Sequence, residues 1–236
     1  MAQADLFKWR HFEKTIIVMA VRWYLRYGLS YRDVAELLME RGVKVAHSTI
    51  YRWVQRYAPE LDKLSRKYLK ASNDSYRVDE TYIKVKGKWK YLYRAVDSKG
   101  NTIDFLLTAK RDKQAAKRFF TKVMNNTHHT KARVINVDKN AAYPKAVEEL
   151  KKEKVLPQST KLRQNKYLNN MIEQDHRFIK RRINVGLGFK TFHTAQRTLQ
   201  GIEMINMVRK GQINGVKKGD IPAQVNFFNQ LFDIAA

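Results

Sequence analysis

Large apolar side chains recur at helical spacing in the first part of the chain. Between residues 13 and 27 they fall every three or four positions and cover more than one side of the predicted helix. A helix with so wide an apolar surface packs inside a small bundle or against another subunit. A second helix is predicted to begin after Ser30 and to end at Gly42, because Ser30 and Asp33 form the pattern of a capping box.

A third helix follows and completes a helix-turn-helix at about residues 30–57. We expect Ser48 to cap this helix, which would run from Thr49 to Tyr57 and stop near Pro59. Its side chains available to a DNA major groove are Thr49, Arg52, Gln55 and Arg56. A plain helical hairpin with solvated arginines is the alternative.

Apolar and polar side chains alternate with period two after a polar joint at residues 71–75. The strands predicted from this alternation form a meander and are 76–86, 89–96 and 102–108. Helical and strand patterns then follow in the order helix 112–125, strand 132–137, helix 141–152, strand 160–163 and helix 168–183. The order β-β-β-α-β-α-β-α predicts an α/β fold with a mixed sheet flanked by helices.

The sequence therefore divides into three regions. Residues 1–70 form a helical N-terminal region, residues 71–209 an α/β domain, and residues 210–236 a basic linker followed by an apolar C-terminal helix. Three apolar side chains of this last helix recur at helical spacing, namely Val225, Phe228 and Phe232. So apolar a short helix needs a surface on which to dock, and we expect that surface on another subunit or on the α/β domain.

The charge balance indicates a polyanionic partner. Lys and Arg number 47 against 22 Asp and Glu, a net charge of +25 that runs through both halves of the chain. Such a protein binds nucleic acid, anionic lipid or an acidic protein. The longest apolar run has six residues, too few for a membrane span or a signal peptide, so nucleic acid is favoured. The absence of cysteine excludes disulfides, thiolate zinc sites and cysteine nucleophiles, and is typical of a cytoplasmic protein.

Three carboxylates lie where the predicted elements could bring them together. Asp79 is an acid inside an apolar strand, which is costly unless the acid is paired or bound to a metal. Asp138 directly follows an apolar strand, at the carboxyl end where open α/β sheets build their sites. Glu173 and Lys180 fall on one flank of the helix 168–183. Ordinary alternatives exist, since Asp138 could cap the next helix, and Glu173 could be a solvated acid with an unrelated Lys180. Together, three carboxylates on separate elements can hold a pair of divalent metal ions.

Neighbouring polar residues are weaker candidates. Glu80 points to the opposite side of the strand from Asp79. Asn140 and Tyr143 could steady the site or contact DNA, although capping and packing are simpler roles, and His176 is expected to pack rather than to bind metal. Three arginines beside the strip of Glu173 and Lys180 could neutralise DNA phosphates, namely Arg177, Arg181 and Arg182.

These residues stand in motifs that resemble the DDE motif of bacterial insertion-sequence transposases. The motifs are VDET at 78–81, VDKN at 137–140 and NMIE at 170–173, with 34 residues between Asp138 and Glu173 and with Lys180 seven residues later. Three longer segments resemble more narrowly the insertion-sequence-six family, namely RWYLRYGLSYRDVAELLMERG, HSTIYRWVQRYAPEL and FHTAQRTLQGIEMINMVRKGQ. The resemblance covers nearly the whole chain.

The resemblance implies an RNase H-like catalytic domain behind a helix-turn-helix that reads the terminal inverted repeats of the element. It makes Asp79, Asp138 and Glu173 the catalytic and metal-binding residues, with two Mg²⁺ or Mn²⁺ ions in each site. Lys180 and Arg177 would then contact DNA phosphates. The activity would be DNA strand cleavage and strand transfer to target DNA, with cointegrate formation. We further expect a homo-oligomer, a dimer or larger, on double-stranded DNA, associated with the nucleoid when bound, with no membrane partner and no small-molecule substrate.

Two other functions are compatible with parts of the pattern. A non-catalytic helix-turn-helix DNA-binding regulator would leave Asp79 and the arrangement of Asp138, Glu173 and Lys180 unexplained. An RNase H-like nuclease that cuts without strand transfer would not need a helix-turn-helix that reads sequence. The sequence therefore favours a transposase.

Overall fold

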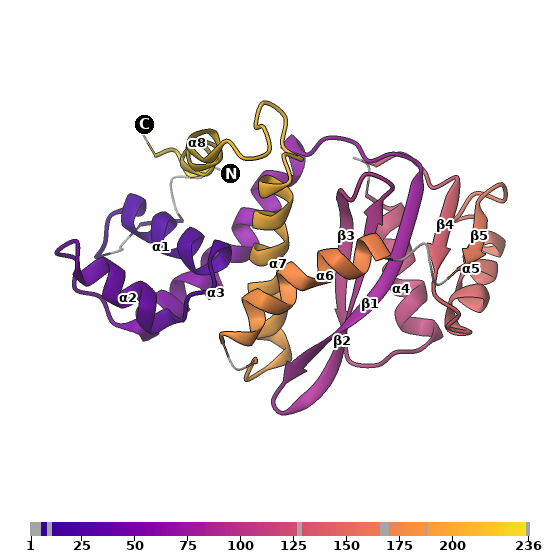
Figure 1. The fold of residues 1–236 in the computed structure, drawn as a ribbon, viewed down its shortest axis with the longest axis horizontal. Coiled ribbons are helices and arrows are strands. Elements are labelled where there is room, and N and C mark those ends of the chain that lie inside the picture. The colour runs from indigo at the N-terminus through magenta and orange to yellow at the C-terminus, as the bar shows by residue number, and fades with distance from the viewer. Residues whose placement is uncertain (1–5, 9–10, 127–128, 166–169, 187, 235–236) are drawn as a thin grey trace. The chain divides into compact units, whose positions relative to one another are not determined.

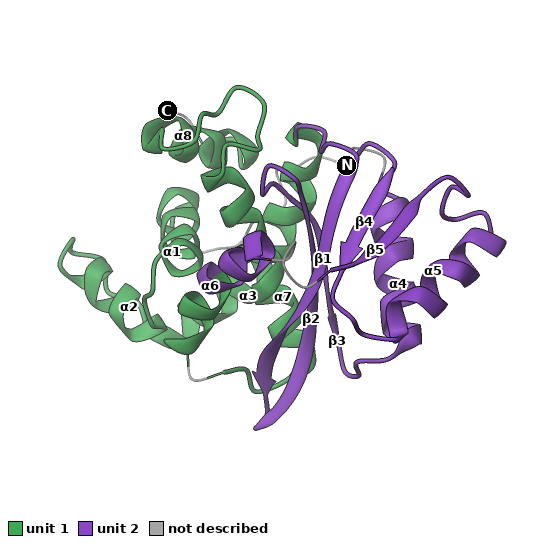
Figure 2. Cartoon of the chain, turned by 45° about the vertical axis from the view of Figure 1, so that its right-hand side comes forward, with its two compact units in different colours: residues 1–69, 179–236 green, residues 70–178 purple. Residues whose placement is uncertain are grey.

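The computed structural model of the 236-residue chain describes residues 6–8, 11–126, 129–165, 170–186 and 188–234. Contacts divide it into two units, each with its own core (Figure 2). Residues 70–178 form one unit, and residues 1–69 together with 179–236 form the other. In the described parts of the chain, no helix is long and apolar enough to cross a membrane.

The unit of residues 70–178 is built on a mixed five-stranded sheet with the order β3-β2-β1-β4-β5 (Figure 1). The strands are β1 Ser75–Val85, β2 Lys88–Asp97, β3 Thr102–Thr108, β4 Val134–Val137 and β5 Lys161–Gln164. The first three pair antiparallel, as the predicted meander, while β1, β4 and β5 run parallel. Lys86 and Gly87, both with positive φ, form the tight turn between β1 and β2.

Helices cover both faces of this sheet. On one face, α4 Lys113–Met124 and α5 Ala142–Lys152 enclose a core with alternate residues of the strands. That core includes Tyr76, Val78, Tyr93, Ala95, Phe119, Phe120, Tyr143 and Ala146. The other face carries Arg94, which donates a hydrogen bond to Asp175 of α6 Asn170–Asn184 at 2.7 Å. The predicted α/β class, with a mixed sheet flanked by helices, is confirmed. The predicted start of the last helix, residue 168, lies outside the described residues.

The other unit is all helical. Its helices are α1 Lys14–Arg26, α2 Tyr31–Met39, α3 His47–Ser65, the 3-10 helix η2 Arg66–Tyr68, the end of α6, α7 Phe192–Arg209 and α8 Ile221–Leu231. As predicted, α1 is buried on more than one side, because it packs against α2, α3, α7 and α8. The predicted capping box begins α2: Asp33 N donates to Ser30 Oγ at 3.2 Å, and Ser30 N donates to Asp33 Oδ2 at 2.7 Å.

The third helix differs from the prediction at both ends. α3 begins at His47 after Ala46, so Ser48 is not its cap. It also continues through Pro59 to Ser65. Ala58 and Leu61, on either side of the proline, are 0% and 3% exposed. Their burial outweighs the backbone hydrogen bond that a proline inside a helix removes.

The C-terminal helix docks on helices of its own unit, a surface that the sequence did not indicate. Phe232 meets Tyr57 of α3 edge-on, with ring centroids 6.4 Å apart, and Phe227 meets Tyr68 at 5.5 Å. The segment before α8 is not a free linker either, since Ile213 is fully buried and forms a β-bridge with Leu69.

The helix α7 is central to its unit. Every residue from Gly201 to Val208 is buried. At Gly201 the helices approach so closely that an added Cβ would lie 2.7 Å from Ala58 Cβ of α3 and 2.6 Å from Leu25 Cδ1 of α1. This packing explains why residues 179–209 group with the N-terminal helices, whereas the sequence placed them in the α/β domain.

A side chain at position 201 would therefore push α7 away from α1 and α3. We expect Gly201→Val to lower the free energy of unfolding by about 2 kcal/mol or more, because overpacking a close contact forces backbone shifts. Gly28→Val is the matched control, since a Cβ there would meet Val185 Cγ2 at an ordinary 3.6 Å. Chemical denaturation measures both variants, and a Gly201→Val protein as stable as the wild type contradicts the packing.

Candidate active site

Two of the predicted carboxylates lie level with each other on neighbouring strands. The parallel pairing of β1 with β4 places Arg77 opposite Asn136. The same register continued by two residues makes Asp79 of β1 level with Asp138, which directly follows β4. Neighbouring strands lie about 4.8 Å apart, and residues at the same level share a face of the sheet. Asp138 directly follows β4, at the carboxyl end of the strand, where the sequence predicted it.

The helix α6 brings the third carboxylate to this face. Asp175 accepts the hydrogen bond from Arg94, and His176 Nδ1 lies 3.8 Å from Asp79 Oδ2, so two residues of α6 meet the sheet here. Glu173 precedes His176 by three residues, the spacing of neighbours on one helix flank. Its side chain is exposed. The structure thus places all three predicted carboxylates around the end of β4 and the middle of β1.

Asp79 lies in a concentration of negative charge. Burial raises the pKa of its carboxyl to about 7, and the charges of Glu80, Asp138 and Glu173 act in the same direction. The Asp79 side chain is only 17% exposed. Its ionised form is therefore poorly compensated by the surrounding protein. A cation bound beside it would supply the missing compensation and restore an ionised carboxylate at neutral pH.

A second carboxylate centre, which the sequence did not identify, lies on the other face of β1. The Glu80 side chain is 1% exposed and accepts hydrogen bonds from Tyr143 Oη and Arg111 Nε. Asn140 Nδ2 lies 3.5 Å from Glu80 Oε1. The sequence oriented Glu80 correctly, away from Asp79, but gave it little weight. The sequence did hold a signal for this centre, because an acid in the middle of a strand that helices cover requires buried hydrogen-bond partners.

Arg111 joins the two centres. Its Nη2 lies 3.2 Å from Asp138 Oδ2, while its Nε pairs with Glu80. Burial alone would lower the pKa of Arg111, but the ion pair with Glu80 overrides it, so the pKa is raised. Asp138 Oδ1 also accepts a hydrogen bond from the backbone N–H of Asn140 at 3.0 Å. Asp138 is thus held in place from both of its oxygens.

The chemistry of the three carboxylates suits a hard divalent cation. Carboxylate oxygens are the ligands that Mg²⁺ and Mn²⁺ prefer, and the poorly compensated charge of Asp79 is what such an ion would neutralise. Among the residues that the structure describes, however, no three His, Asp or Glu side chains have the arrangement of a metal site. Arg111 takes one oxygen of Asp138, and the Glu173 side chain is exposed to solvent. A metal site made of Asp79, Asp138 and Glu173 would therefore require the side chains of Arg111 and Glu173 to adopt other rotamers.

The predicted phosphate contacts on α6 divide into exposed and buried residues. Arg177 and Lys180 are exposed, as a DNA contact requires. Arg182 is only 3% exposed, and its guanidinium donates hydrogen bonds to the carbonyls of Tyr24 and Leu29. Arg182 therefore fastens the end of α6 within the helical unit and is not a surface cation, contrary to the expectation from sequence.

The predicted major-groove contacts on α3 divide in the same way. Arg52 and Arg56 are exposed, and Thr49 is half-buried. Gln55 differs from the expectation, because its Nε2 donates to Thr198 Oγ1 of α7 at 2.8 Å. α7 covers this flank of α3, a contact between distant segments that the local pattern did not reveal.

A family model and two curated relatives agree on the class of the chain. A family model described as a DDE domain matches residues 73–212, which include all three predicted carboxylates. The transposase for insertion sequence-like element IS431mec of Staphylococcus aureus is 44% identical over 206 residues, which cover 87% of this chain and 89% of that protein. The transposase for insertion sequence element IS257 in transposon Tn4003, from the same species, is 43% identical over the same shares. Among solved structures, the HTLV-2 integrase catalytic core domain in complex with magnesium (dimeric form) aligns with a TM-score of 0.44 and 14% identity, over 62% of this chain and 92% of that one.

The pKa of Asp79 predicts how the stability of the metal-free protein depends on pH. The folded-state pKa of about 7 exceeds the unfolded value of about 3.9, so the folded state binds this proton more tightly. The resulting stabilisation is complete below the unfolded pKa and is lost as the pH rises through the folded pKa. We expect Asp79→Asn to remove this loss and to be more stable than the wild type at about pH 8.

Chemical denaturation in a chelating buffer, repeated from about pH 5 to about pH 8, measures this effect. Glu148→Gln is the control, since Glu148 is an exposed carboxylate of α5 outside the cluster. If Asp79→Asn and the wild type lose stability equally over this range, Asp79 does not have the raised pKa.

Proposed function

Because the chain belongs to the insertion-sequence-six family of DDE transposases, we propose that it binds the terminal inverted repeats of its element and catalyses metal-dependent cleavage and strand transfer of their DNA. One observation carries the assignment of the site. The β1–β4 pairing sets Asp79 level with Asp138, and Glu173 of α6 is near enough for its charge to raise the pKa of Asp79. Such a convergence of carboxylates is what a phosphodiester-cleaving metal site requires.

In this proposal Asp79, Asp138 and Glu173 hold two Mg²⁺ or Mn²⁺ ions. When bound, two such ions activate the attacking oxygen and stabilise the leaving oxygen of a phosphodiester. Asp79 has to be ionised for this role, and a neighbouring cation favours that form. Arg111 positions Asp138 through their ion pair, and its guanidinium can exchange that carboxylate for a phosphate oxygen of DNA.

The proposed reaction consists of two displacements at phosphorus. First, water attacks the phosphodiester at the end of the element, the bond from phosphorus to the 3′-oxygen breaks, and the strand ends in a 3′-hydroxyl. Second, this hydroxyl loses its proton and attacks a phosphodiester of the target DNA, whose own 3′-oxygen leaves. Neither displacement needs a covalent bond between protein and DNA. We propose a cointegrate as the product, as the family resemblance implies.

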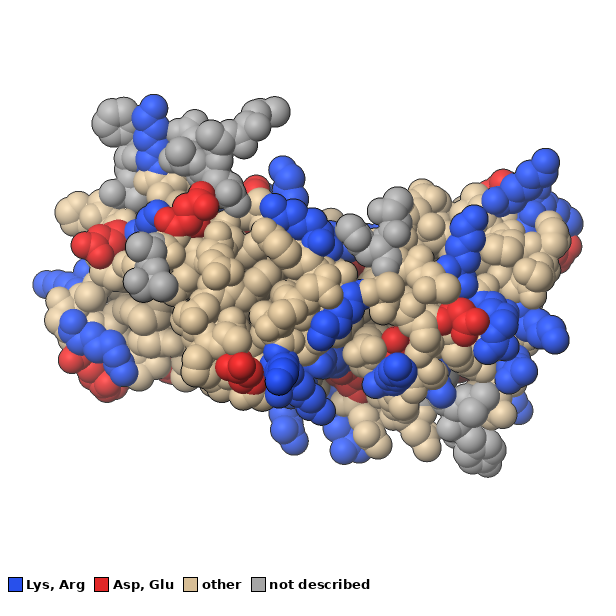
Figure 3. Space-filling view, turned by 90° about the horizontal axis from the view of Figure 1, so that it is seen from above, with Lys and Arg blue, Asp and Glu red and all other residues tan. Residues whose placement is uncertain are grey.

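Exposed cations suit the chain to double-stranded DNA. Arg52 and Arg56 lie on α3, the second helix of the helix-turn-helix, and Arg177 and Lys180 lie on α6. Figure 3 shows Lys and Arg side chains spread over the drawn face, with Asp and Glu in fewer places. A net charge of +25 favours a polyanion and makes binding strongly dependent on salt. Because two element ends and a target have to be held together, we propose a homo-oligomer, a dimer or larger.

Bound Mg²⁺ should stabilise the native protein. At saturating Mg²⁺ we expect the melting temperature of the wild type to rise by about 5 °C or more, because a ligand of the folded state stabilises it by mass action. Asp79→Asn and Glu173→Gln should lose most of this rise. Glu148→Gln, an exposed glutamate on a helix like Glu173, should retain it. Thermal unfolding monitored by fluorescence measures all four proteins, and equal rises in all of them would place the metal elsewhere.

A strand-transfer assay tests the activity itself. Purified protein is incubated with Mg²⁺, a target plasmid and labelled duplex DNA that carries the inverted repeat. We expect Asp138→Asn and Glu173→Gln to reduce joined product by about 100-fold or more, because losing a metal ligand forfeits several kcal/mol of charge stabilisation. Their affinity for the repeat duplex, measured by fluorescence anisotropy, should change far less. Undiminished strand transfer by either variant would refute the assignment.

A further inference from the structure

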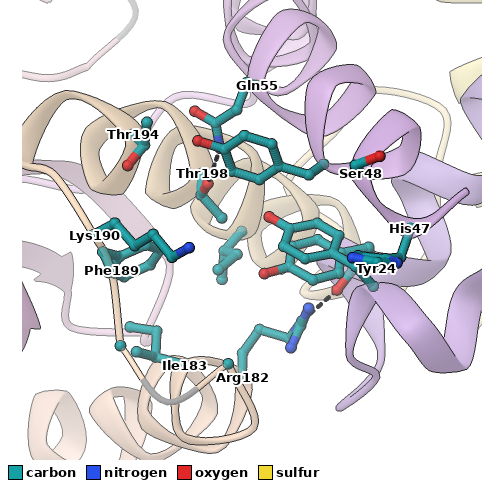
Figure 4. A pocket seen from close by; sticks show the side chains of 15 residues that line it. Tyr24, His47, Ser48, Gln55, Arg182, Ile183, Phe189, Lys190, Thr194 and Thr198 are labelled. Atoms are coloured by element: carbon teal, nitrogen blue, oxygen red, sulfur yellow. Dashed lines mark hydrogen bonds between the residues drawn. The ribbon is translucent and has the colours of Figure 1, made fainter.

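A pocket of about 550 Å³ lies within the helical unit (Figure 4). Its lining comes from α1, α2, the first half of α3, the end of α6, residues between α6 and α7, and α7 as far as Ile202. Pockets of this volume hold small molecules or single groups of larger ones. None of the three carboxylates proposed for the reaction lines it, so the pocket is not part of the candidate active site.

One wall of the pocket is aromatic. The Tyr31 ring stacks on Tyr24 with centroids 4.0 Å apart, and Tyr51 meets Tyr31 edge-on at 5.6 Å. Tyr51 is 38% exposed, so part of its ring is available to a ligand. Figure 4 shows Phe189 across the cavity from Tyr24. Aromatic surfaces of this kind bind planar rings such as nucleobases by stacking.

A second part of the lining suits an anion. His47 and Ser48, the first two residues of α3, line the pocket, and the N-cap residue Ala46 makes no side-chain cap. The start of this 19-residue helix, which carries the positive end of the helix dipole, therefore lies at the pocket. Lys190 points its ammonium group into the cavity in Figure 4. None of the described lining residues is acidic.

Gln55 adds a hydrogen-bond acceptor to the wall. Its Nε2 donates to Thr198 Oγ1 at 2.8 Å, which fixes the amide against α7. Its Oε1 is buried and has no hydrogen-bond partner among the described residues. A buried acceptor in this state is unfavourable unless a ligand supplies a donor. The ring N–H and exocyclic amino groups of nucleobases are such donors, and a small rotation of the Gln55 side chain would present the oxygen to them.

We propose that this pocket receives one unstacked nucleotide, whose base stacks on Tyr51 and hydrogen-bonds to Gln55 and whose phosphate lies between the start of α3 and Lys190. The inference rests on the proposed function, which makes the nucleotide one that is extruded from the bound repeat-end DNA. Proteins that extrude a base read it by stacking and by hydrogen bonds to its edge. Capture of one nucleotide would fix the position of the DNA end along the protein. A free nucleotide has the same chemistry, and the experiment separates the two sources.

The first measurement determines whether DNA fills the pocket. The full-length protein is titrated, without divalent metal, with repeat-end duplexes in which one base pair at a time is replaced by a mismatch. Removing its partner makes a base easier to extrude, so at the captured position we expect binding to tighten about fivefold or more. Tyr51→Ala should lose this gain, because base–aromatic stacking is lost, whereas Tyr51→Phe should retain it.

Two further variants complete this measurement. Tyr68→Ala is the matched control, since Tyr68 is 39% exposed, close to the 38% of Tyr51, and does not line the pocket. It should keep the mismatch gain. Lys190→Glu replaces an exposed cation of the pocket lining and should reduce the gain in affinity at the mismatch. This variant keeps Tyr51, so its result does not depend on whether Tyr51→Ala folds normally. A gain that persists in both Tyr51→Ala and Lys190→Glu overturns the proposal.

The second measurement tests the free nucleotide as the source. Saturation-transfer NMR with deoxyadenosine 5′-monophosphate reports binding without DNA. A signal that is present in the wild type and absent in Tyr51→Ala supports the nucleotide chemistry of the pocket, and without a mismatch gain it makes a free nucleotide the ligand. No signal and no mismatch gain at any position overturns the proposal. Neither measurement uses Asp138, so failure of the pocket leaves strand transfer intact, and failure of strand transfer leaves nucleotide binding measurable.

Discussion

The parallel pairing of β1 with β4 is the constraint on which the candidate active site depends. The pairing sets the register of the two strands, which lie about 4.8 Å apart, and the same register continued by two residues makes Asp79 level with Asp138. Arg111 and the backbone N–H of Asn140 then hold the Asp138 carboxylate in place. Burial raises the pKa of Asp79 to about 7, and the charge of Asp138, kept close by this register, acts in the same direction. The repulsion that weakens the metal-free fold also increases the gain when a cation binds, because the sheet cannot relax by moving the two carboxylates apart.

The alternation of side chains along β1 gives two adjacent acids different roles. Glu80 faces the core with α5 and is satisfied by Tyr143 and Arg111, so it is a structural carboxylate. Asp79 faces α6, where His176 is 3.8 Å away and other carboxylates surround it. Arg111 links the two faces because it also pairs with Asp138. The position of the catalytic candidate Asp138 thus depends on a buried acid that takes no part in the proposed chemistry.

Local patterns in the sequence were sufficient for the strands and for the capping box of Ser30 and Asp33, because each depends on short-range periodicity or on a motif. They also indicated that Asp79, Asp138 and Glu173 lie close together, as the charge effects on Asp79 confirm, whereas metal binding by these residues stays a prediction. What they missed depends on contacts between distant segments. Gln55 bonds to Thr198, Arg182 bonds to Tyr24, and α8 docks beside α3. These pairs lie more than 140 positions apart in the chain, so no local periodicity encodes them. The same packing carries α3 through Pro59.

The proposed metal ions would also affect the binding of DNA at this site, before any bond is broken, through their charge. The chain has a net charge of +25, yet its candidate active site gathers Asp79, Asp138 and Glu173, and Arg111 pairs with only one of them, Asp138. A phosphodiester attracted by the surrounding surface would be repelled at this point. Two divalent ions would add four positive charges and reverse the sign of the local field. The carboxylates that we propose as metal ligands would therefore also make the approach of the scissile phosphate depend on the metal.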